Sequence, residues 1–95
     1  MDLGKVLRKA QAGRVDKKND VLVTIEPTEP GSGIQIEIKS PVIAEFGRQI
    51  RQTVQSVLEE TAVDDVLVQV EDKGAMDFAI RARTETAIRR AQREV

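Results

Sequence analysis

Apolar and polar residues alternate in four short segments of this chain, the period of two that is typical of strands with one buried face. The segments are residues 21–26, 34–39, 66–71 and 76–83. Turn residues separate them in pairs, because two prolines and two glycines fall within 27–33 and a glycine falls within 72–75. The pattern therefore predicts two β-hairpins, reversing at 27–33 and at 72–75.

Three other segments have helical spacing. The longest begins at Ser40–Pro41, where a hydroxyl can cap the helix and proline fits the first helical position. Its apolar stripe consists of Ile43, Phe46, Ile50, Val54 and Val57. A short helix from Asp2 to a terminator at Gly13 precedes the first strand, and a last helix runs from Thr84 to 94. The chain is thus predicted to be α+β, a four-stranded antiparallel sheet of two hairpins with helices packed on one face.

A rival interpretation concerns the second hairpin. Residues 74–94 also fit one long helix, because Ala75, Phe78, Ala79, Ala82, Thr86 and Arg89 recur at tolerable helical spacing. Periodicity alone does not separate short strands from buried helix segments. The hairpin is preferred here because Met76, Phe78, Ile80 and Ala82 alternate with more polar neighbours.

Composition narrows the class of protein. The 95 residues, 40% hydrophobic and 33% charged, are those of one globular domain spanning 1–95. The sequence has no Cys and no His, which removes thiol nucleophiles, disulfides, common zinc sites and the usual neutral-pH base. Catalysis by the chain itself is therefore not expected.

Charge and aromatic content argue against nucleic acid and acidic membranes as partners. The formal net charge is −1, so the chain has no overall attraction for nucleic acid or acidic membranes. Phe46 and Phe78 are the only aromatic residues, too few to stack bases, and a small RNA- or phosphate-binding domain is only a minor alternative. Because the N-terminus lacks a signal-peptide pattern and no apolar run reaches roughly 18 residues, the expected compartment is the cytoplasm, without membrane attachment.

Few side chains in the predicted loops suggest chemistry. Asp64–Asp65 is a carboxylate pair, but it lies at a helix-to-strand turn where Asp bonds the local backbone, and no further ligands complete a metal site. The Gly31–Gly33 segment lacks the length and the Lys of a P-loop and is a turn. On a strand, Arg81 and Arg83 would point the same way and could bind a phosphate or a partner's carboxylates, the alternative being a solvated face.

Five segments in order resemble the acyl carrier (gamma) subunit of citrate lyase, over about residues 12 to 91. They are Ala12–Gly13, Asp20–Pro27, Phe46–Gly47 with Ile50–Arg51, Asp72–Asp77 and Arg81–Arg83. The resemblance implies a subunit of a cytoplasmic complex. In it, a phosphoribosyl-dephospho-coenzyme A arm presents acetyl or citryl thioester to the alpha and beta subunits, while the carrier itself catalyses nothing. Candidate partner-binding residues are Asp72, Lys73, Gly74, Arg81 and Arg83.

The residue that should carry the arm is different in this chain. The family attaches it to a serine in a Gly-Thr-Leu-Glu-Ser-Ser/Gly-Asp segment, whereas Gly13–Asp20 is one residue longer and has Lys18 or Lys17 at that place. An amine does not form the stable phosphodiester that a serine oxygen forms. Three explanations stay open: a structural or assembly subunit that has lost the arm, an arm on another hydroxyl such as Ser32 or Thr28, or an altered segment. A stand-alone interaction module of the same fold is the alternative from another class.

Overall fold

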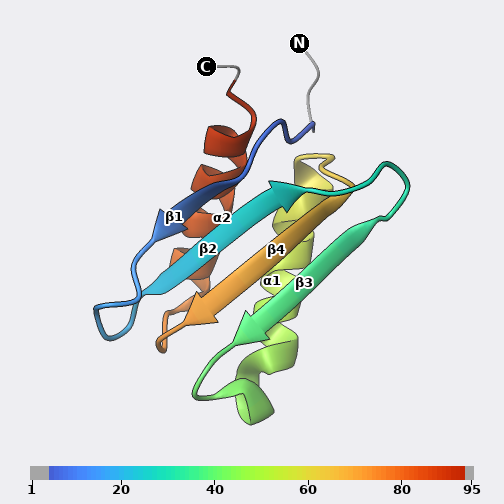
Figure 1. Cartoon of the computed structure of the whole chain (residues 1–95). Helices are drawn as coiled ribbons and strands as arrows, with labels where there is room; N and C mark the ends of the chain where they lie inside the picture. Colours follow the sequence, from blue (N-terminus) through green and yellow to red (C-terminus); the bar gives the residue numbers. More distant parts are fainter. Residues whose placement is uncertain (1–4, 94–95) are drawn as a thin grey trace.

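The computed structural model describes residues 5–93 as two layers, a four-stranded sheet with two helices across one face (Figure 1). The strands are β1 (Ala10–Gly13), β2 (Val21–Pro27), β3 (Ile34–Lys39) and β4 (Val66–Asp72), and the helices are α1 (Ile43–Glu60) and α2 (Asp77–Ala91). The predicted α+β class, with helices on one face of a four-stranded sheet, is confirmed. No helix among the described residues is both long and apolar enough to cross a bilayer.

The strand order is β1-β2-β4-β3, which differs from the predicted pair of hairpins. β3 runs parallel to β4, while β1–β2 and β2–β4 are antiparallel, so the prediction of an all-antiparallel sheet is wrong at β3. The connection 27–33 does not reverse a hairpin; it takes the chain past the place of β4. Every helix-facing valine of β4 is buried, whereas Ile34 and Ile38 of β3 are only partly so. β4 therefore lies inside the sheet and β3 at its edge, and α1 is the crossover between these two parallel strands.

The predicted second hairpin is absent, and the rival helix is close to the structure. After β4 the chain makes a turn and enters α2, whose buried residues recur at helical spacing: Ile80, Thr84, Ala87, Ile88 and Ala91. Thr84, predicted to begin the last helix, lies inside α2, where its hydroxyl donates to the Ile80 carbonyl at 2.7 Å. Arg81 and Arg83 are two positions apart, so they point roughly 200° apart around the helix and not the same way.

The prediction of an N-terminal helix is also wrong for the described residues of that segment. Residues 5–9 form no helix, and Ala10–Gly13 pairs with β2 instead; Asp2 lies outside the described residues. The Leu7 N–H donates to the Ala91 carbonyl at 2.9 Å, and the Arg90 guanidinium donates to the Gln11 carbonyl at 2.8 Å. These tertiary bonds to the last turn of α2 replace the local bonds of a helix.

Within the described residues, the hydrophobic core between the layers consists of aliphatic side chains and alanine, and Thr84 of α2 is buried as well. Within the predicted stripe of α1, Ile50, Val54 and Val57 are buried, but Ile43 and Phe46 are 46% and 47% exposed. α1 begins two residues after Pro41 and extends past the end of β3, so its first turn has no sheet beneath it (Figure 1). Both aromatic residues of the chain, Phe46 and Phe78, therefore lie outside the core.

Candidate functional site

Both helices begin at the end of the sheet where β1, β3 and β4 end and β2 begins, which we call the loop end (Figure 1). The opposite end, made by residues 27–34 and 60–66, is the turn end. At the loop end the β1–β2 loop, residues 14–20, lies beside the turn 73–76 that leads into α2. The Asn19 N–H donates to the Lys73 carbonyl and the Lys73 N–H donates to the Asp20 carbonyl, both at 2.9 Å. Two segments far apart in sequence are thus joined by backbone bonds.

An ion pair connects the same loop to α2. Arg83 donates to Asp20 through Nη2 at 3.2 Å and through Nε at 3.4 Å, while the Val21 N–H donates to the same carboxylate at 2.7 Å. The Val21 N–H, with Arg83 in addition, lowers the pKa of Asp20. Arg83 therefore holds the loop, whereas Arg81 faces away and pairs with Glu60 and Glu85.

Asp72 shapes the turn between β4 and α2. It is 2% exposed and accepts the N–H groups of Gly74 and Ala75 at 3.0 and 2.8 Å and the Ser40 hydroxyl at 2.7 Å. Gly74 adopts φ +91°, which favours glycine. Of the residues expected to bind partners, Asp72 is internal, Lys73 and Gly74 are exposed, and both arginines take part in ion pairs.

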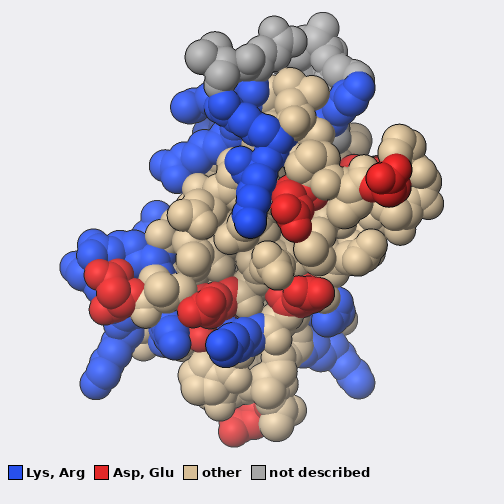
Figure 2. All heavy atoms as spheres, in the orientation of Figure 1, with Lys and Arg blue, Asp and Glu red and all other residues tan. Residues whose placement is uncertain are grey.

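The two lysines at the serine position lie on the exposed β1–β2 loop. Figure 2 shows basic side chains gathered over this corner of the molecule, at the left. Arg14 and Asp16 form an ion pair at 2.6 Å within the loop, which raises the pKa of the guanidinium and lowers that of the carboxyl. Lys17 and Lys18 follow directly, and both are exposed. Residues 14–20 contain no hydroxyl to which a phosphodiester could be attached.

Three hydroxyls in the other connections are either far from this loop or already hydrogen-bonded. Thr28 and Ser32 lie at the turn end and hydrogen-bond to each other at 2.6 Å, with Ser32 also donating to the Glu29 carbonyl. Ser40 is at the loop end but donates to Asp72 and accepts the Val42 N–H. The segment that resembles the family's attachment loop is therefore unsuited to that family's arm.

A hollow of about 480 Å³ opens between the first turns of α1 and α2. Its walls are largely apolar: Val42, Phe46, Ile50, Ala75, Met76 and Ile80. Phe46 was predicted to be in the core and Met76 in a strand, so reasoning from the sequence missed this surface. The signal in the sequence was that only two aromatic residues, Phe46 and Phe78, accompany apolar residues that are otherwise mostly aliphatic.

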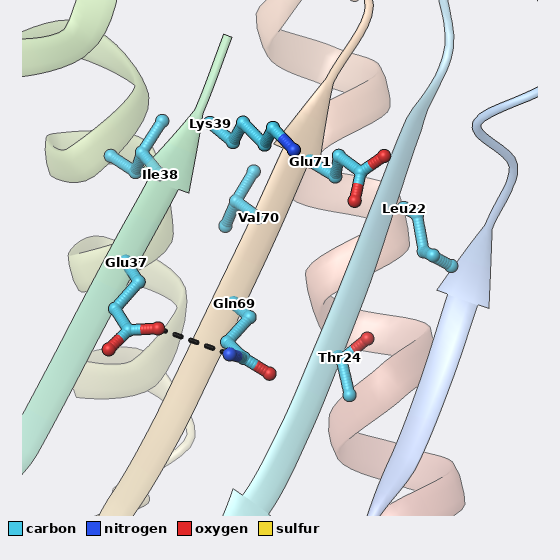
Figure 3. A pocket seen from close by; sticks show the side chains of 8 residues that line it. All are labelled: Leu22, Thr24, Glu37, Ile38, Lys39, Gln69, Val70 and Glu71. Carbon is cyan, nitrogen blue, oxygen red and sulfur yellow. Dashed lines mark hydrogen bonds between the residues drawn. The ribbon is translucent and has the colours of Figure 1, made fainter.

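The sheet face away from the helices carries a shallower hollow of about 270 Å³ (Figure 3). Polar side chains of the three strands β2, β4 and β3 lie across it, among them Thr24, Gln69 and Glu37, with Gln69 donating to Glu37 at 3.1 Å. Residues 5–93 hold no group of three or more Cys, His, Asp or Glu that could bind a metal ion.

At the turn end, Asp65 has a structural role. Its carboxylate accepts the N–H groups of Gly31 and Gly33 at 3.0 and 2.9 Å. The Gly33 N–H, and then that of Gly31, lower the pKa of Asp65. The sequence predicted that Asp64–Asp65 stabilises a turn and does not bind a metal, and Asp65 does stabilise this turn.

Known proteins share both sequence and fold with the chain. A family model of acyl carriers, described as malonate decarboxylase delta subunit (MdcD), matches residues 7–91. The citrate lyase acyl carrier protein of Treponema denticola is 46% identical over 87 residues, 92% of this chain and 95% of that one. That of Halothermothrix orenii is 37% identical over 89 residues, 94% and 92% of the two chains. A chain in the crystal structure of a Pseudomonas malonate decarboxylase hetero-tetramer in complex with malonate has a TM-score of 0.78 at 21% identity, covering 96% of this chain and 92% of that one.

Proposed function

Because this chain belongs to the family of citrate lyase acyl carrier proteins, we propose that it occupies the place of the carrier (gamma) subunit in a citrate lyase-type complex. In that place it binds the alpha and beta subunits in the cytoplasm and has no catalytic activity of its own. One observation carries the proposal: the segments that resemble the family, Asp20, Asp72–Ala75 and Arg83, converge on one corner through the bonds described above. The corner is therefore built as one unit from residues distant in sequence.

The prosthetic group that the family implies, phosphoribosyl-dephospho-coenzyme A, does not fit this loop. Attachment needs a hydroxyl oxygen, and Lys17 and Lys18 offer ammonium groups in its place. This observation favours a second candidate function, a carrier-like subunit that assembles with the complex but carries no arm on its β1–β2 loop. The place in the complex is common to both candidates.

Intact mass spectrometry separates the two candidates. The native chain is incubated with a prosthetic-group transferase that modifies the Treponema denticola carrier in the same experiment. We expect the native chain to keep its mass. An increase by the mass of the arm would establish a working carrier, and peptide mapping would then identify the hydroxyl that bears it.

Two matched variants test whether the loop is still recognised. Lys17→Ser and Lys18→Ser each place a hydroxyl at one of the two positions that correspond to the family's serine, counted forward from Gly13 or back from Asp20. We expect one of them to gain the arm, which would also decide the register of the longer loop. If neither gains it, the loop has departed from the family in more than this side chain.

Binding to catalytic subunits tests the place in the complex. The alpha and beta subunits of the Treponema denticola citrate lyase, freed of their own carrier, are mixed with the native chain and measured by calorimetry. We expect a saturable complex. Its absence, while the Treponema carrier binds, would remove the proposed subunit role.

A further inference from the structure

The two aromatic side chains of the sequence are exposed at the loop end although the core contains none. Phe46 is 47% exposed and Phe78 is 73% exposed, and Met76 beside them is 68% exposed. Aromatic and Met side chains are enriched at protein interfaces and dominate their binding energy. Of the large apolar side chains exposed within residues 5–93, Ile43, Phe46, Met76 and Phe78 all lie in or next to the first turns of the two helices.

These side chains border two neighbouring hollows between α1 and α2. The 480 Å³ hollow has Phe46 and Met76 in its walls, and a second hollow of about 360 Å³ has Phe78 in its wall. Gln49 on α1 donates to Asp77 on α2 at 2.6 Å, and both residues line both hollows. We call the two hollows together the aromatic groove. It is large enough to take a bulky apolar side chain from another molecule.

The charge at the groove determines what can accompany that side chain. Asp72 and Asp77 are the charged residues that line the larger hollow; Arg81 lines the smaller one beside Asp77 but is paired with Glu60 and Glu85. Asp72 already accepts three hydrogen bonds and is buried, whereas Asp77 is exposed at the rim. Glu45 in the first turn of α1 is exposed as well. An apolar group flanked by a cation complements this arrangement.

We propose that the aromatic groove is the docking site for a catalytic subunit, which inserts an apolar side chain beside Phe46 and Met76 and places an Arg or Lys against Asp77. The inference rests on the proposed place in a lyase complex and names the surface that secures it. Burial of the anchor would remove Phe46, Met76 and Phe78 from water together.

Affinity for the carrier-free Treponema denticola subunits tests the proposal. Phe46→Asp and Met76→Asp introduce charge into the groove without touching the core, and we expect each to weaken binding at least about 10-fold. Leu7→Asp is the matched control, since Leu7 is 44% exposed but away from the groove, and it should bind as the native chain does. Circular dichroism melts confirm that all variants fold.

A variant of Asp77 tests whether the partner places an Arg or Lys against this residue. Asp77→Asn leaves an oxygen that still accepts from Gln49 but removes the negative charge. We expect binding to weaken about 2- to 5-fold and its dependence on salt to become shallower. Unchanged affinity and salt dependence would remove the cationic part of the proposal.

The remaining outcomes each have a distinct meaning. If the native chain fails to bind, the subunit role falls and this inference falls with it. If it binds and the groove variants bind equally well, the role stands and the groove is not its docking site. Loss of binding by Gln69→Arg on the open sheet face, with the groove variants unaffected, would place the partner on that face instead (Figure 3). Sedimentation that shows a native dimer abolished by Phe46→Asp would assign the groove to a second copy of this chain and overturn the proposal.

Discussion

At both ends of the sheet an aspartate stabilises a turn by accepting backbone N–H groups, but the two ends expose different side chains. At the turn end Asp65 accepts the N–H groups of Gly31 and Gly33, and at the loop end Asp72 accepts those of Gly74 and Ala75. In each case one carboxylate fixes a tight, glycine-containing connection by charge-assisted hydrogen bonds.

The surroundings of the two turns are different. At the turn end the neighbouring hydroxyls of Thr28 and Ser32 bond within the turn itself. At the loop end the turn supports exposed apolar side chains, Met76 and Phe78, and lies beside the basic β1–β2 loop. An Asp–Gly turn alone therefore does not mark a functional site; what matters is the chemistry that it holds in place.

The largest expected difference between the ends concerns two glycines. A Cβ at Gly13, which has φ +103°, would lie 1.8 Å from the Val21 carbonyl oxygen, so Gly13→Ala should lower the free energy of unfolding by on the order of 3 kcal/mol or more. Gly31 has φ +86° but nothing within 4 Å, so Gly31→Ala should cost about 1 kcal/mol. Urea unfolding of both variants measures the difference. Equal losses would mean that backbone conformation alone decides both sites.

Asp72 should be the next most sensitive position. Asp72→Ala leaves two backbone N–H groups and the Ser40 hydroxyl without their acceptor, and we expect unfolding to become easier by about 2–3 kcal/mol. Lys73→Ala, at the exposed neighbour, is the control and should change little. A small effect at Asp72 would show that the turn is held by Gly74 and the helix, not by the carboxylate.

Acid should weaken the turn end through Asp65. Its pKa is lower in the folded chain than in the unfolded one, so its stabilising contribution is complete above the unfolded value, roughly 4, and is lost as pH falls through the folded value. In Asp65→Asn that part of the pH dependence should disappear, which thermal melts from pH 6 to pH 2 measure. Asp20→Asn makes the matching test at the loop end, where the pKa is lowered as well. Melting curves that fall with pH just as in the native chain would contradict the assignment.

The smallest effect on stability, but a clear one on the loop, is expected at Arg83. The ion pair with Asp20 is half exposed, so Arg83→Ala should cost less than about 1 kcal/mol. The β1–β2 loop should nevertheless open more often, and trypsin should cleave after Lys17 and Lys18 faster. Arg81→Ala removes a comparable arginine that faces α1 and should leave cleavage of the loop unchanged.

The sequence predicted those elements whose burial follows from local periodicity. The valines of β4 and the isoleucines of β3 alternate clearly, and the buried part of α1 follows its stripe from Ile50 onward. Periodicity shows which face is buried but not which strand lies beside which. It therefore did not reveal that β4 separates β2 from β3.

Two misassigned segments have a common cause. Met76, Phe78 and Ile80 alternate as a strand would, yet Ile80, Thr84 and Ala87 are buried at helical spacing. β1 is only four residues long and three of them are Ala or Gly, so tertiary pairing with β2 and bonds to α2 outweighed a weak helical pattern. Short segments of this kind take their structure from what they pack against.

The candidate site was predictable only in part. The resemblance identified Asp72–Ala75 and the arginines, and the two lysines at the serine position follow from counting residues. The contact between Arg83 and Asp20 joins positions 63 residues apart and depends on the fold. The exposure of Phe46 depends on the length by which α1 extends past the sheet, which no local pattern encodes.

The central position of β4 in the sheet limits when the chain can fold during its synthesis on the ribosome. β2 and β3 both pair with β4 and not with each other, so β3 cannot join the pair formed by β1 and β2 until residues 66–72 have left the exit tunnel. α2, which covers β1 and β2, is translated later still. The domain can therefore bury its core only after residues 10–91 have all been synthesised, and we expect it to fold as one unit and not strand by strand.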